Sequence, residues 1–324
     1  MTDGSIRFEA TGSPDVLSWA ETPVSPPGPG EALVRHDAVG VNFIDVYFRT
    51  GTYPAPLPSG LGMEGAGVVE AVGDGVTHVA PGDRVAYCGG PLGAYATARS
   101  LPASRLVKLP DSVGSDVAAS VMLKGLTVEY LVRRTYAVQP GDTVLLHAAA
   151  GGVGLIACQW LKLLGATVIG VVGNQDKAAL AQAHGADHTI LTGEDVAARV
   201  REITGGAGVP VVYDSVGRDT LMASLDSLRP RGMMVSFGNA SGMVPPVDLG
   251  LLASRGSLFI TRPSLTHYAA DRGELETAAA ELFRLLGNGS LRIGTGSRYA
   301  LRDAAQAHRD LEGRRTTGSL LLIP

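Results

Sequence analysis

A glycine-rich turn near the middle of the chain constrains the fold more than any other feature of the sequence. Residues 143–148 are apolar and have strand propensity, and a cluster of glycines follows them directly. After the glycines, apolar residues recur at helical spacing, namely Val153, Ile156, Ala157, Trp160, Leu161 and Leu164. A strand, a tight turn and a helix form half of a βαβ unit. We therefore expect a dinucleotide to bind here, with Gly151, Gly152 and Val153 close to its pyrophosphate.

The glycine motif is weak by itself, because Ala149 stands at its first glycine position. A second expected strand, residues 167–172, ends where dinucleotide folds place the residue that contacts the adenosine ribose. Proteins that prefer NAD have Asp or Glu there. This chain has Gly173 and Asn174 at the strand end and Lys177 one helical turn later, which favours NADPH. In the alternative interpretation, Lys177 is a solvated charge and Asp176 repels a phosphate.

The pattern after this point alternates between strands and helices. Strands are expected at 188–191, 210–214, 233–237 and 257–262, and helices at about 176–184, 195–203 and 219–228. This predicts an α/β Rossmann fold with a doubly wound parallel sheet of six strands. A cofactor lies across the carboxyl ends of such strands. The candidate contacts there are Ser215, Phe237, Gly238, Asn239, Pro263, Ser264 and Leu265, although each could equally belong to an ordinary turn.

The two ends of the chain have a different character. Residues 1–125 contain short strand-like runs interrupted by Pro and Gly, which predicts an irregular β-rich domain. Helices at about 274–286 and 304–311 and a strand at 320–323 are expected to return to that domain. The resulting division is a catalytic domain of residues 1–125 and 266–324, with a dinucleotide-binding domain of residues 126–265 between its parts.

Composition excludes several other classes of protein. The net charge of −4 over 324 residues provides no basic stripe, so nucleic acid is an unlikely partner. Two cysteines, Cys88 and Cys158, cannot build a disulfide framework, and no apolar signal region begins the chain, so we expect a cytoplasmic protein. Residues 143–161 are apolar enough to resemble a membrane span. The glycines, His147 and Gln159 instead favour a buried strand and helix, and no membrane association is expected.

Four blocks of sequence carry a family resemblance: Val-Asn-Phe-Ile-Asp at 41–45 followed by Tyr47, Glu-Gly-Ala-Gly-Val-Val at 64–69, Ala-Ala-Gly-Gly-Val-Gly at 149–154, and Val-Tyr-Asp-Ser-Val-Gly at 212–217. Together they resemble the medium-chain dehydrogenase/reductases and, within them, the zinc-free quinone oxidoreductases related to zeta-crystallin. This resemblance covers nearly the whole chain. It implies a GroES-like catalytic domain, NADPH-dependent reduction of quinones, and cofactor contacts at Thr127, Tyr130 and Thr317.

The resemblance also implies a homodimer. Residues 257–261 (Ser-Leu-Phe-Ile-Thr) would form the edge of the sheet, and an apolar edge strand favours pairing with a second copy. In the alternative, a loop covers this edge.

Zinc-dependent members of the larger family hold the metal with Cys and His, at positions that can be matched to this chain. Asn42 stands in place of the Cys, and Met63 stands in place of the His before Glu64. The cysteine-rich lobe that holds a structural zinc is missing around Cys88. Amide and thioether groups are poor zinc ligands, so no metal site is expected. Catalysis without a Lewis acid suits an electron-poor acceptor such as a quinone or an activated enone.

The candidate hydrogen-bond donors to the reduced acceptor are Asn42, Tyr47 and Tyr53, and we favour Asn42 and Tyr47. Asp45 is interpreted as an orienting residue, because an ionised carboxylate next to a developing oxyanion would be unfavourable. In the alternative, Tyr47 and Tyr53 only pack as aromatic rings in a proline-rich loop.

Three functions are compared. The first is an NADPH:quinone oxidoreductase, and the second is an NADPH-dependent reductase of the carbon–carbon double bond in enones or alkenals. These two share a hydride geometry and differ in pocket shape. The third is an NADPH-binding structural or RNA-binding protein with little turnover. The acidic charge balance disfavours RNA, and Asn42 and Tyr47 favour an active pocket.

Overall fold

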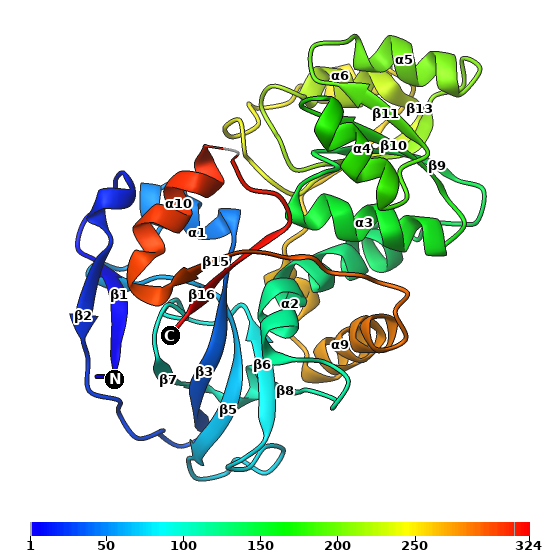
Figure 1. Ribbon diagram of the computed structural model, residues 1–324. Coiled ribbons are helices and arrows are strands. Elements are labelled where there is room, and N and C mark those ends of the chain that lie inside the picture. The colour runs from blue at the N-terminus through cyan, green and yellow to red at the C-terminus, as the bar shows by residue number, and fades with distance from the viewer. Residues whose placement is uncertain (1, 314) are drawn as a thin grey trace. The chain divides into compact units, whose positions relative to one another are not determined.

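The computed structural model describes residues 2–313 and 315–324, and the chain divides into two compact units (Figure 1). One unit comprises Met1–Leu126 and Ala269–Pro324, and the other comprises Thr127–Tyr268. In the described residues, no helix is long and apolar enough to cross a bilayer.

The unit Thr127–Tyr268 contains one parallel sheet with strand order β11-β10-β9-β12-β13-β14. Its strands are β9 (Thr143–His147), β10 (Thr167–Val172), β11 (His188–Leu191), β12 (Val209–Asp214), β13 (Leu228–Ser236) and β14 (Phe259–Thr261). Its helices are α3 (Gly152–Leu163), α4 (Gln175–Ala183), α5 (Val196–Ile203), α6 (Leu221–Ser227), α7 (Leu249–Ser254), α8 (Leu265–Tyr268) and a π-helical turn, Tyr130–Thr135. The expected six-stranded doubly wound sheet is confirmed.

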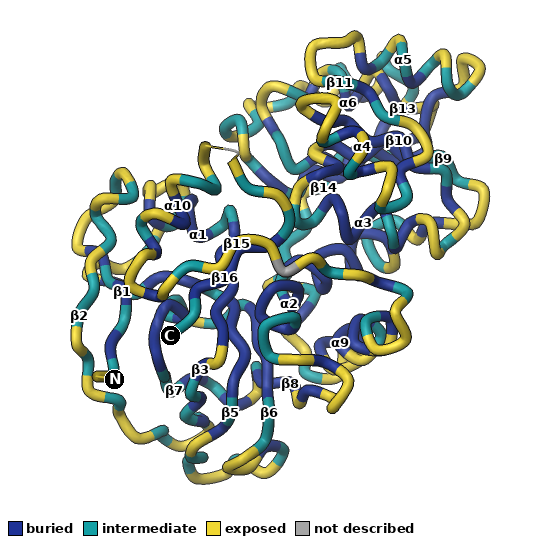
Figure 2. The backbone as a smooth tube through the Cα atoms, viewed as in Figure 1, coloured by how far each residue is buried: buried dark blue, intermediate teal, exposed yellow. Residues whose placement is uncertain are grey.

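Apolar runs explain why these segments form the central strands. Every residue of β12 is buried, as is nearly all of β9 and β10, which is typical of parallel strands covered by helices on both faces. Leu145, Ile169, Ile190 and Val212 meet in one core. In Figure 2 these strands are dark blue, whereas the loops that lead into α4 and α5 are yellow.

The last strand of this sheet is shorter than the sequence predicts. We expected a strand over residues 257–262, but β14 contains only Phe259–Thr261. Ser257 has a positive φ of 58°, and its N–H donates to the carbonyl of Ala253, so it belongs to the turn that follows α7. β14 lies at the edge of the sheet, and Phe259 is 56% exposed.

The other unit is rich in antiparallel strands. One sheet has the order β15-β16-β3-β5-β6-β8, with β7 paired to β3, and a second has the order β2-β1-β4. The strands are β1 (Gly4–Phe8), β2 (Ser18–Glu21), β3 (Glu31–Val41), β4 (Ser59–Gly60), β5 (Glu64–Val72), β6 (Arg84–Cys88), β7 (Ala98–Pro102), β8 (Val107–Lys108), β15 (Thr295–Ala300) and β16 (Ser319–Ile323). The helices are α1 (Phe43–Thr50), α2 (Ser115–Glu129), α9 (Arg272–Gly287) and α10 (Ala304–Glu312), with short 3-10 turns at Pro14–Val16, Ala103–Arg105 and Leu301–Asp303. α2 continues across the boundary between the two units.

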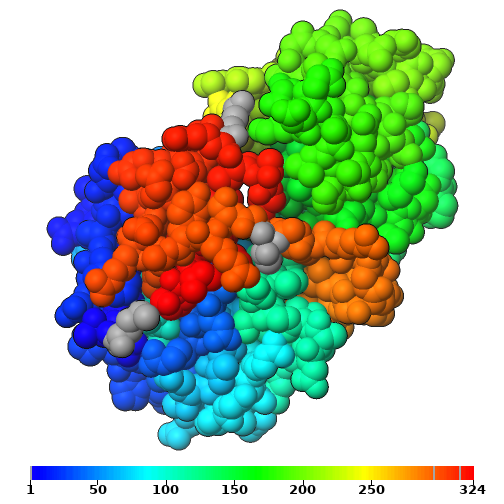
Figure 3. All heavy atoms as spheres, viewed as in Figure 1, coloured from blue at the N-terminus to red at the C-terminus, as the bar shows by residue number. Residues whose placement is uncertain are grey.

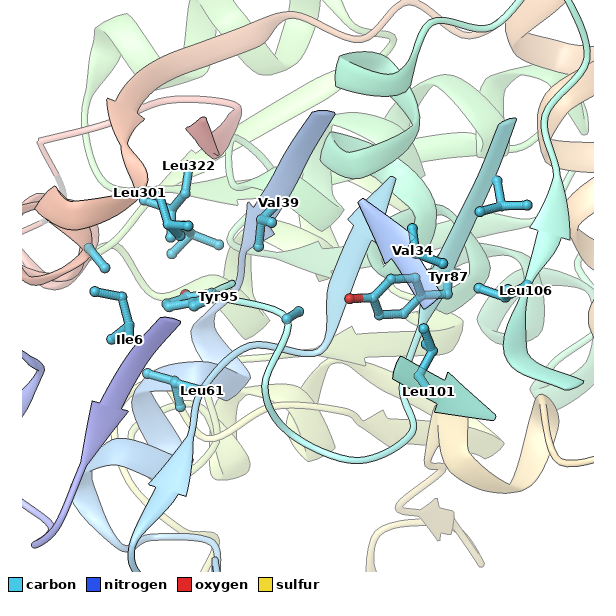
Figure 4. Close-up of a cluster of buried hydrophobic side chains, with 14 of the residues drawn as sticks. Ile6, Val34, Val39, Leu61, Tyr87, Tyr95, Leu101, Leu106, Leu301 and Leu322 are labelled. Atoms are coloured by element: carbon cyan, nitrogen blue, oxygen red, sulfur yellow. The ribbon is translucent and has the colours of Figure 1, made fainter. Parts of the chain in front are cut away.

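Both ends of the chain contribute to the larger sheet of this unit. β16 pairs antiparallel with β3, with Leu320 opposite Val41. Figure 3 shows C-terminal residues, in orange and red, packed beside N-terminal residues in blue. Figure 4 shows the buried cluster beneath these strands, where Ile6, Leu61 and Leu322 come from three distant segments.

Candidate active site

Asn42 lies between β3 and α1, where it is the N-terminal capping residue of the helix. Its backbone N–H donates to Asp45 Oδ2 at 2.8 Å, and its side-chain Nδ2 donates to Glu64 Oε2 at 2.7 Å. The residue is only 4% exposed. Two carboxylates therefore hold Asn42 in place. The contact with Glu64 uses one of the two N–H groups of the side-chain amide.

Glu64, at the start of β5, is completely buried. Its Oε1 accepts from the backbone N–H of Leu123 at 2.7 Å, and Lys124 Nζ lies 3.7 Å from its Oε2. Burial raises the pKa of Glu64, whereas the charge of Lys124 and the bond from Asn42 act in the opposite direction. A Cβ at Gly40 would lie 2.2 Å from Glu64 Oε2, so the adjacent strand position requires glycine.

Asp45, in the first turn of α1, is also completely buried. Its Oδ2 accepts from Asn42 N and from the hydroxyl of Tyr95 at 3.0 Å, whereas its Oδ1 has no hydrogen-bond partner among the described residues. Burial raises the pKa of Asp45 to about 7, because an incompletely hydrogen-bonded carboxylate away from water favours its neutral form.

Tyr47 and Tyr53 lie together in an aromatic cluster on and after α1. Their ring centroids are 5.1 Å apart in an edge-to-face arrangement, and Phe43 and Phe48 contact Tyr47 and Tyr53, respectively. The backbone N–H of Tyr53 donates to the carbonyl of Tyr47. Tyr47 thus lies on the helix that begins after Asn42, and Tyr53 packs against it from the segment that follows the helix. A role for their hydroxyls stays a prediction.

In the unit Thr127–Tyr268, the glycine-rich turn leads from β9 directly into α3. Gly151 is the capping residue of this helix, and no side-chain hydrogen bond caps its first turn, which includes Gly152 and Val153. A Cβ at Gly154 would lie 2.3 Å from the carbonyl oxygen of Ala148, so the helix and the turn approach as closely as glycine permits. The amides at this helix N-terminus fit a pyrophosphate group.

The end of β10 is the next candidate cofactor contact. Gly173 is exposed, and a Cβ there would meet nothing within 4 Å. The side chain of Asn174 caps α4 by accepting from the backbone N–H of Lys177 at 2.9 Å. The Lys177 ammonium forms no ion pair with the described residues. Asn174 therefore has a structural role in starting the helix on which Lys177 lies.

The loops that follow β12 and β13 pack tightly against each other. A Cβ at Gly238 would lie 2.3 Å from the carbonyl oxygen of Ser215, which also accepts from Ala240 N. Phe237 and Asn239 flank Gly238 in the same loop. These four predicted contacts are thus brought together at the carboxyl edge of the sheet, and Pro263, Ser264 and Leu265 lie between β14 and the start of α8.

Three further cofactor contacts are implied by the resemblance alone. Thr127 and Tyr130 are buried near the end of α2, where the Tyr130 ring stacks on Tyr268 with 4.5 Å between centroids. Thr317 lies in the other unit, exposed, two residues before β16. Thr317 therefore belongs to a different unit from the other cofactor candidates.

Sequence reasoning missed several buried polar residues. Asp214 accepts from the hydroxyls of Thr220 and Ser224. The Ser224 hydroxyl also lies 3.0 Å from Nε2 of His147, a buried residue of β9. In the other unit, the hydroxyl of Tyr95 contacts Asp45, which is 50 residues away in the sequence, and His308, which is 213 residues away. Such separations leave no local signal in the sequence.

Two family models match the chain: the alcohol dehydrogenase GroES-like domain over residues 28–111 and the zinc-binding dehydrogenase over residues 152–283. A quinone oxidoreductase of Pseudomonas aeruginosa is 55% identical over 321 residues, which are 98% of this chain and 99% of that protein. The chain belongs to the quinone oxidoreductases of the medium-chain dehydrogenase/reductase superfamily.

Two further members of this superfamily are similar over their full length. The crystal structure of Escherichia coli quinone oxidoreductase complexed with NADPH has a TM-score of 0.96 and 50% identity, covering 99% of this chain and 100% of that chain. A 2-haloacrylate reductase of a Burkholderia species is 49% identical over 325 residues, covering 97% of this chain and 96% of that protein.

The name of one matching family refers to zinc, but Asn42 and Met63 stand where zinc-dependent members have Cys and His. Glu64 is already bound by Asn42, Leu123 and Lys124, and the ammonium of Lys124 supplies the positive charge beside it. In the part of the chain that the structure describes, no group of three or more His, Cys, Asp or Glu side chains could hold a metal ion.

Proposed function

We propose that this protein is an NADPH:quinone oxidoreductase that transfers a hydride to a small quinone without zinc. The observation that carries the proposal is similarity over nearly the whole chain, at 50–55% identity, to quinone oxidoreductases, one of them complexed with NADPH. The proposal assigns cofactor binding to the Rossmann domain, residues 126–265, and the acceptor to the catalytic domain, residues 1–125 and 266–324.

The geometry of each unit supports this division of work. The uncapped amides at the start of α3 and the ammonium of Lys177 would bind the pyrophosphate and the 2′-phosphate of NADPH. Asn42 and Tyr47 would donate hydrogen bonds to the oxygen of the acceptor as negative charge develops there. NADPH supplies the hydride, and a quinone is electron-poor enough to accept it without a Lewis acid.

The loss of nicotinamide absorbance tests the proposal. NADPH and NADH are compared in parallel with a small quinone, a bulky polycyclic quinone and an α,β-enone. We expect rapid oxidation of NADPH by at least one quinone, slower oxidation of NADH, and a size preference that reports the width of the pocket. Tight NADPH binding without turnover of any of the three acceptors would contradict the proposal and favour the non-catalytic alternative.

Reduction of an activated carbon–carbon double bond is the second candidate function. It is favoured by the 49% identity to a 2-haloacrylate reductase over nearly the full length of both chains. Both reactions use hydride transfer to an electron-poor centre, so the same assay separates them: turnover of the enone alone would assign the protein to double-bond reduction.

Two further parts of the proposal concern assembly and location. We propose a homodimer in which β14 pairs with its copy, because this strand is an edge of the sheet and Phe259 is more than half exposed.

A cytoplasmic location is supported by Cys88 and Cys158, which are both free thiols.

A further inference from the structure

A buried chain of hydrogen bonds links the first turn of α1 to α10 in the catalytic unit. Asp45 Oδ2 accepts from Asn42 N at 2.8 Å and from the Tyr95 hydroxyl at 3.0 Å, and the same hydroxyl lies 3.1 Å from His308 Nε2. Asp45, Tyr95 and His308 are all completely buried. Figure 4 shows the ring of Tyr95 near Ile6 and Leu61 in the apolar core.

The number of protons fixes the direction of each bond. Tyr95 has one hydroxyl proton, and while Asp45 is ionised that proton is donated to Asp45 Oδ2. His308 must then donate its own proton from Nε2 to the Tyr95 oxygen. This leaves His308 Nδ1 as a bare acceptor, and Nδ1 is a buried atom with no partner among the described residues. An unpaired buried acceptor is tolerated better than an unpaired buried N–H.

Asp45 is the member of the chain that titrates near neutral pH. Burial raises its pKa to about 7; Glu64 of β5 raises this pKa further, while Lys124 of α2 lowers it. Burial and the positive charge of Arg49 lower the pKa of His308 to about 3, so its imidazole stays neutral. Burial raises the pKa of Tyr95 well above its ordinary value.

Arg49 and Glu312 complete the charged surroundings of the chain. Both terminal nitrogens of Arg49 donate to the carboxylate of Glu312 on α10, each at 2.8 Å. This ion pair joins α1 to α10, the two helices that carry Asp45 and His308.

On the basis of the proposed function, we infer that Tyr95 and His308 are positioning residues that set the protonation state of Asp45 and thereby hold Asn42 in place. The hydrogen-bonded series of Asp45, Tyr95 and His308 has a second arrangement in which it carries one more proton. That proton enters at His308 Nδ1, the Nε2 proton passes to the Tyr95 oxygen, and the Tyr95 proton passes to Asp45. A neutral Asp45 accepts more weakly from Asn42 N than an ionised one does.

The substitution Tyr95→Phe tests the inference through the pH profile of kcat. We expect kcat to fall at low pH as Asp45 becomes protonated, and this fall is the acid limb of the profile. Removing the hydroxyl withdraws a donor that favours ionised Asp45, so the pKa of Asp45 rises and the acid limb moves to higher pH. A hydrogen bond to a charged group predicts a shift of about one to two pH units. At pH values above this limb, we expect kcat of the variant to return to the wild-type value. The KM for NADPH should stay unchanged.

Tyr87→Phe is a matched control. Tyr87 is completely buried, and its hydroxyl lies 2.8 Å from His36 Nε2, but no carboxylate accepts from it in the described structure. Its removal should leave the acid limb in place. The inference would be overturned if the acid limb had the same midpoint pH in the wild type and in Tyr95→Phe. It would also be overturned if Tyr95→Phe and Tyr87→Phe shifted that midpoint equally.

Nitrogen NMR of histidine-labelled wild-type protein provides a second measurement that needs neither a variant nor turnover. We expect the His308 proton to reside on Nε2 above the acid limb and on Nδ1 below it. An unchanged tautomer across the limb would overturn the inference even if Tyr95→Phe failed to fold. Failure of the proposed function would be seen separately, as no quinone turnover at any pH.

Discussion

Asn42 is held at both of its polar ends, by Asp45 at the backbone and by Glu64 at the side chain. This arrangement restricts the amide to one orientation before any acceptor arrives. Such preorganisation is what a hydrogen bond to a developing oxyanion requires, because the donor need not reorient during the reaction. Its cost is the burial of two carboxylates, which Lys124 and Tyr95 partly offset.

Tyr47→Phe separates a chemical role of the hydroxyl from simple ring packing. The substitution keeps the edge-to-face contacts with Phe43 and Tyr53. If the hydroxyl stabilises the reduced acceptor, we expect kcat with a small quinone to fall at least about tenfold with little change in the KM for NADPH. Steady-state kinetics checks this.

Tyr53→Phe is the comparison, because it removes a hydroxyl from the neighbouring ring of the same cluster. We expect a smaller effect there. A fall of less than twofold in Tyr47→Phe would leave Tyr47 as a wall of the pocket.

Lys177→Ala tests the assignment of the 2′-phosphate contact. Loss of a charge-assisted contact should raise the Kd for NADPH by about 10- to 100-fold and change the Kd for NADH little. Binding titrations with the two nucleotides measure the ratio. Lys162→Ala removes a cation from α3 that pairs with Asp187, and it should leave the selectivity intact. Unchanged selectivity in Lys177→Ala would move the contact to another residue.

At the scale of elements, the close approach of α3 to the preceding turn predicts the effect of a single methyl group. A Cβ at position 154 would meet the Ala148 carbonyl at 2.3 Å, and backbone atoms cannot move aside as a side chain can. We expect Gly154→Ala to cost about 1–3 kcal/mol of stability. It should also weaken NADPH binding, because the turn must open.

Thermal unfolding and NADPH titration measure both effects. Gly173→Ala is the control for stability, since a Cβ there meets no atom within 4 Å. Equal melting temperatures for the wild type and Gly154→Ala would show that the turn is more adaptable than its geometry indicates.

The six strands of the Rossmann unit and its helices α3 to α6 could be predicted from the sequence because their apolar periodicity is strong and local. β10 and β11 match the expected residues at both ends. β14 is shorter than expected. Three apolar residues after Ser257 suggest a longer strand, but Ser257 itself adopts a left-handed conformation in the turn after α7. Local patterns do not reveal where a backbone reverses its handedness.

The candidate site could be predicted only in part, for a related reason. Asn42, Asp45 and Tyr47 lie within one short block, so their proximity follows from the sequence. Tyr95 and His308 reach the same place through long-range packing of the β-rich unit. Only the folded chain brings Tyr95 to Asp45 and His308 to Tyr95.

At the scale of the whole molecule, the exposed edge of β14 predicts how copies associate. Phe259→Asp places a charge where two edges would pair, so we expect a dimer to dissociate into monomers. Analytical ultracentrifugation at several concentrations gives the mass. Met222→Asp alters an apolar residue of α6 that is 45% exposed, and it should not change the mass. A wild-type protein that sediments as a monomer would remove the proposed interface.

The position of β16 between β15 and β3 sets an order of events during synthesis. Residues 127–268 contain every strand of their own sheet, so this unit can fold while the chain is still attached to the ribosome. The larger sheet of the other unit lacks an interior strand until residues 319–323 have been made. A chain stopped before that point would present an open apolar edge along β3, and it would be a natural target for chaperones and proteases.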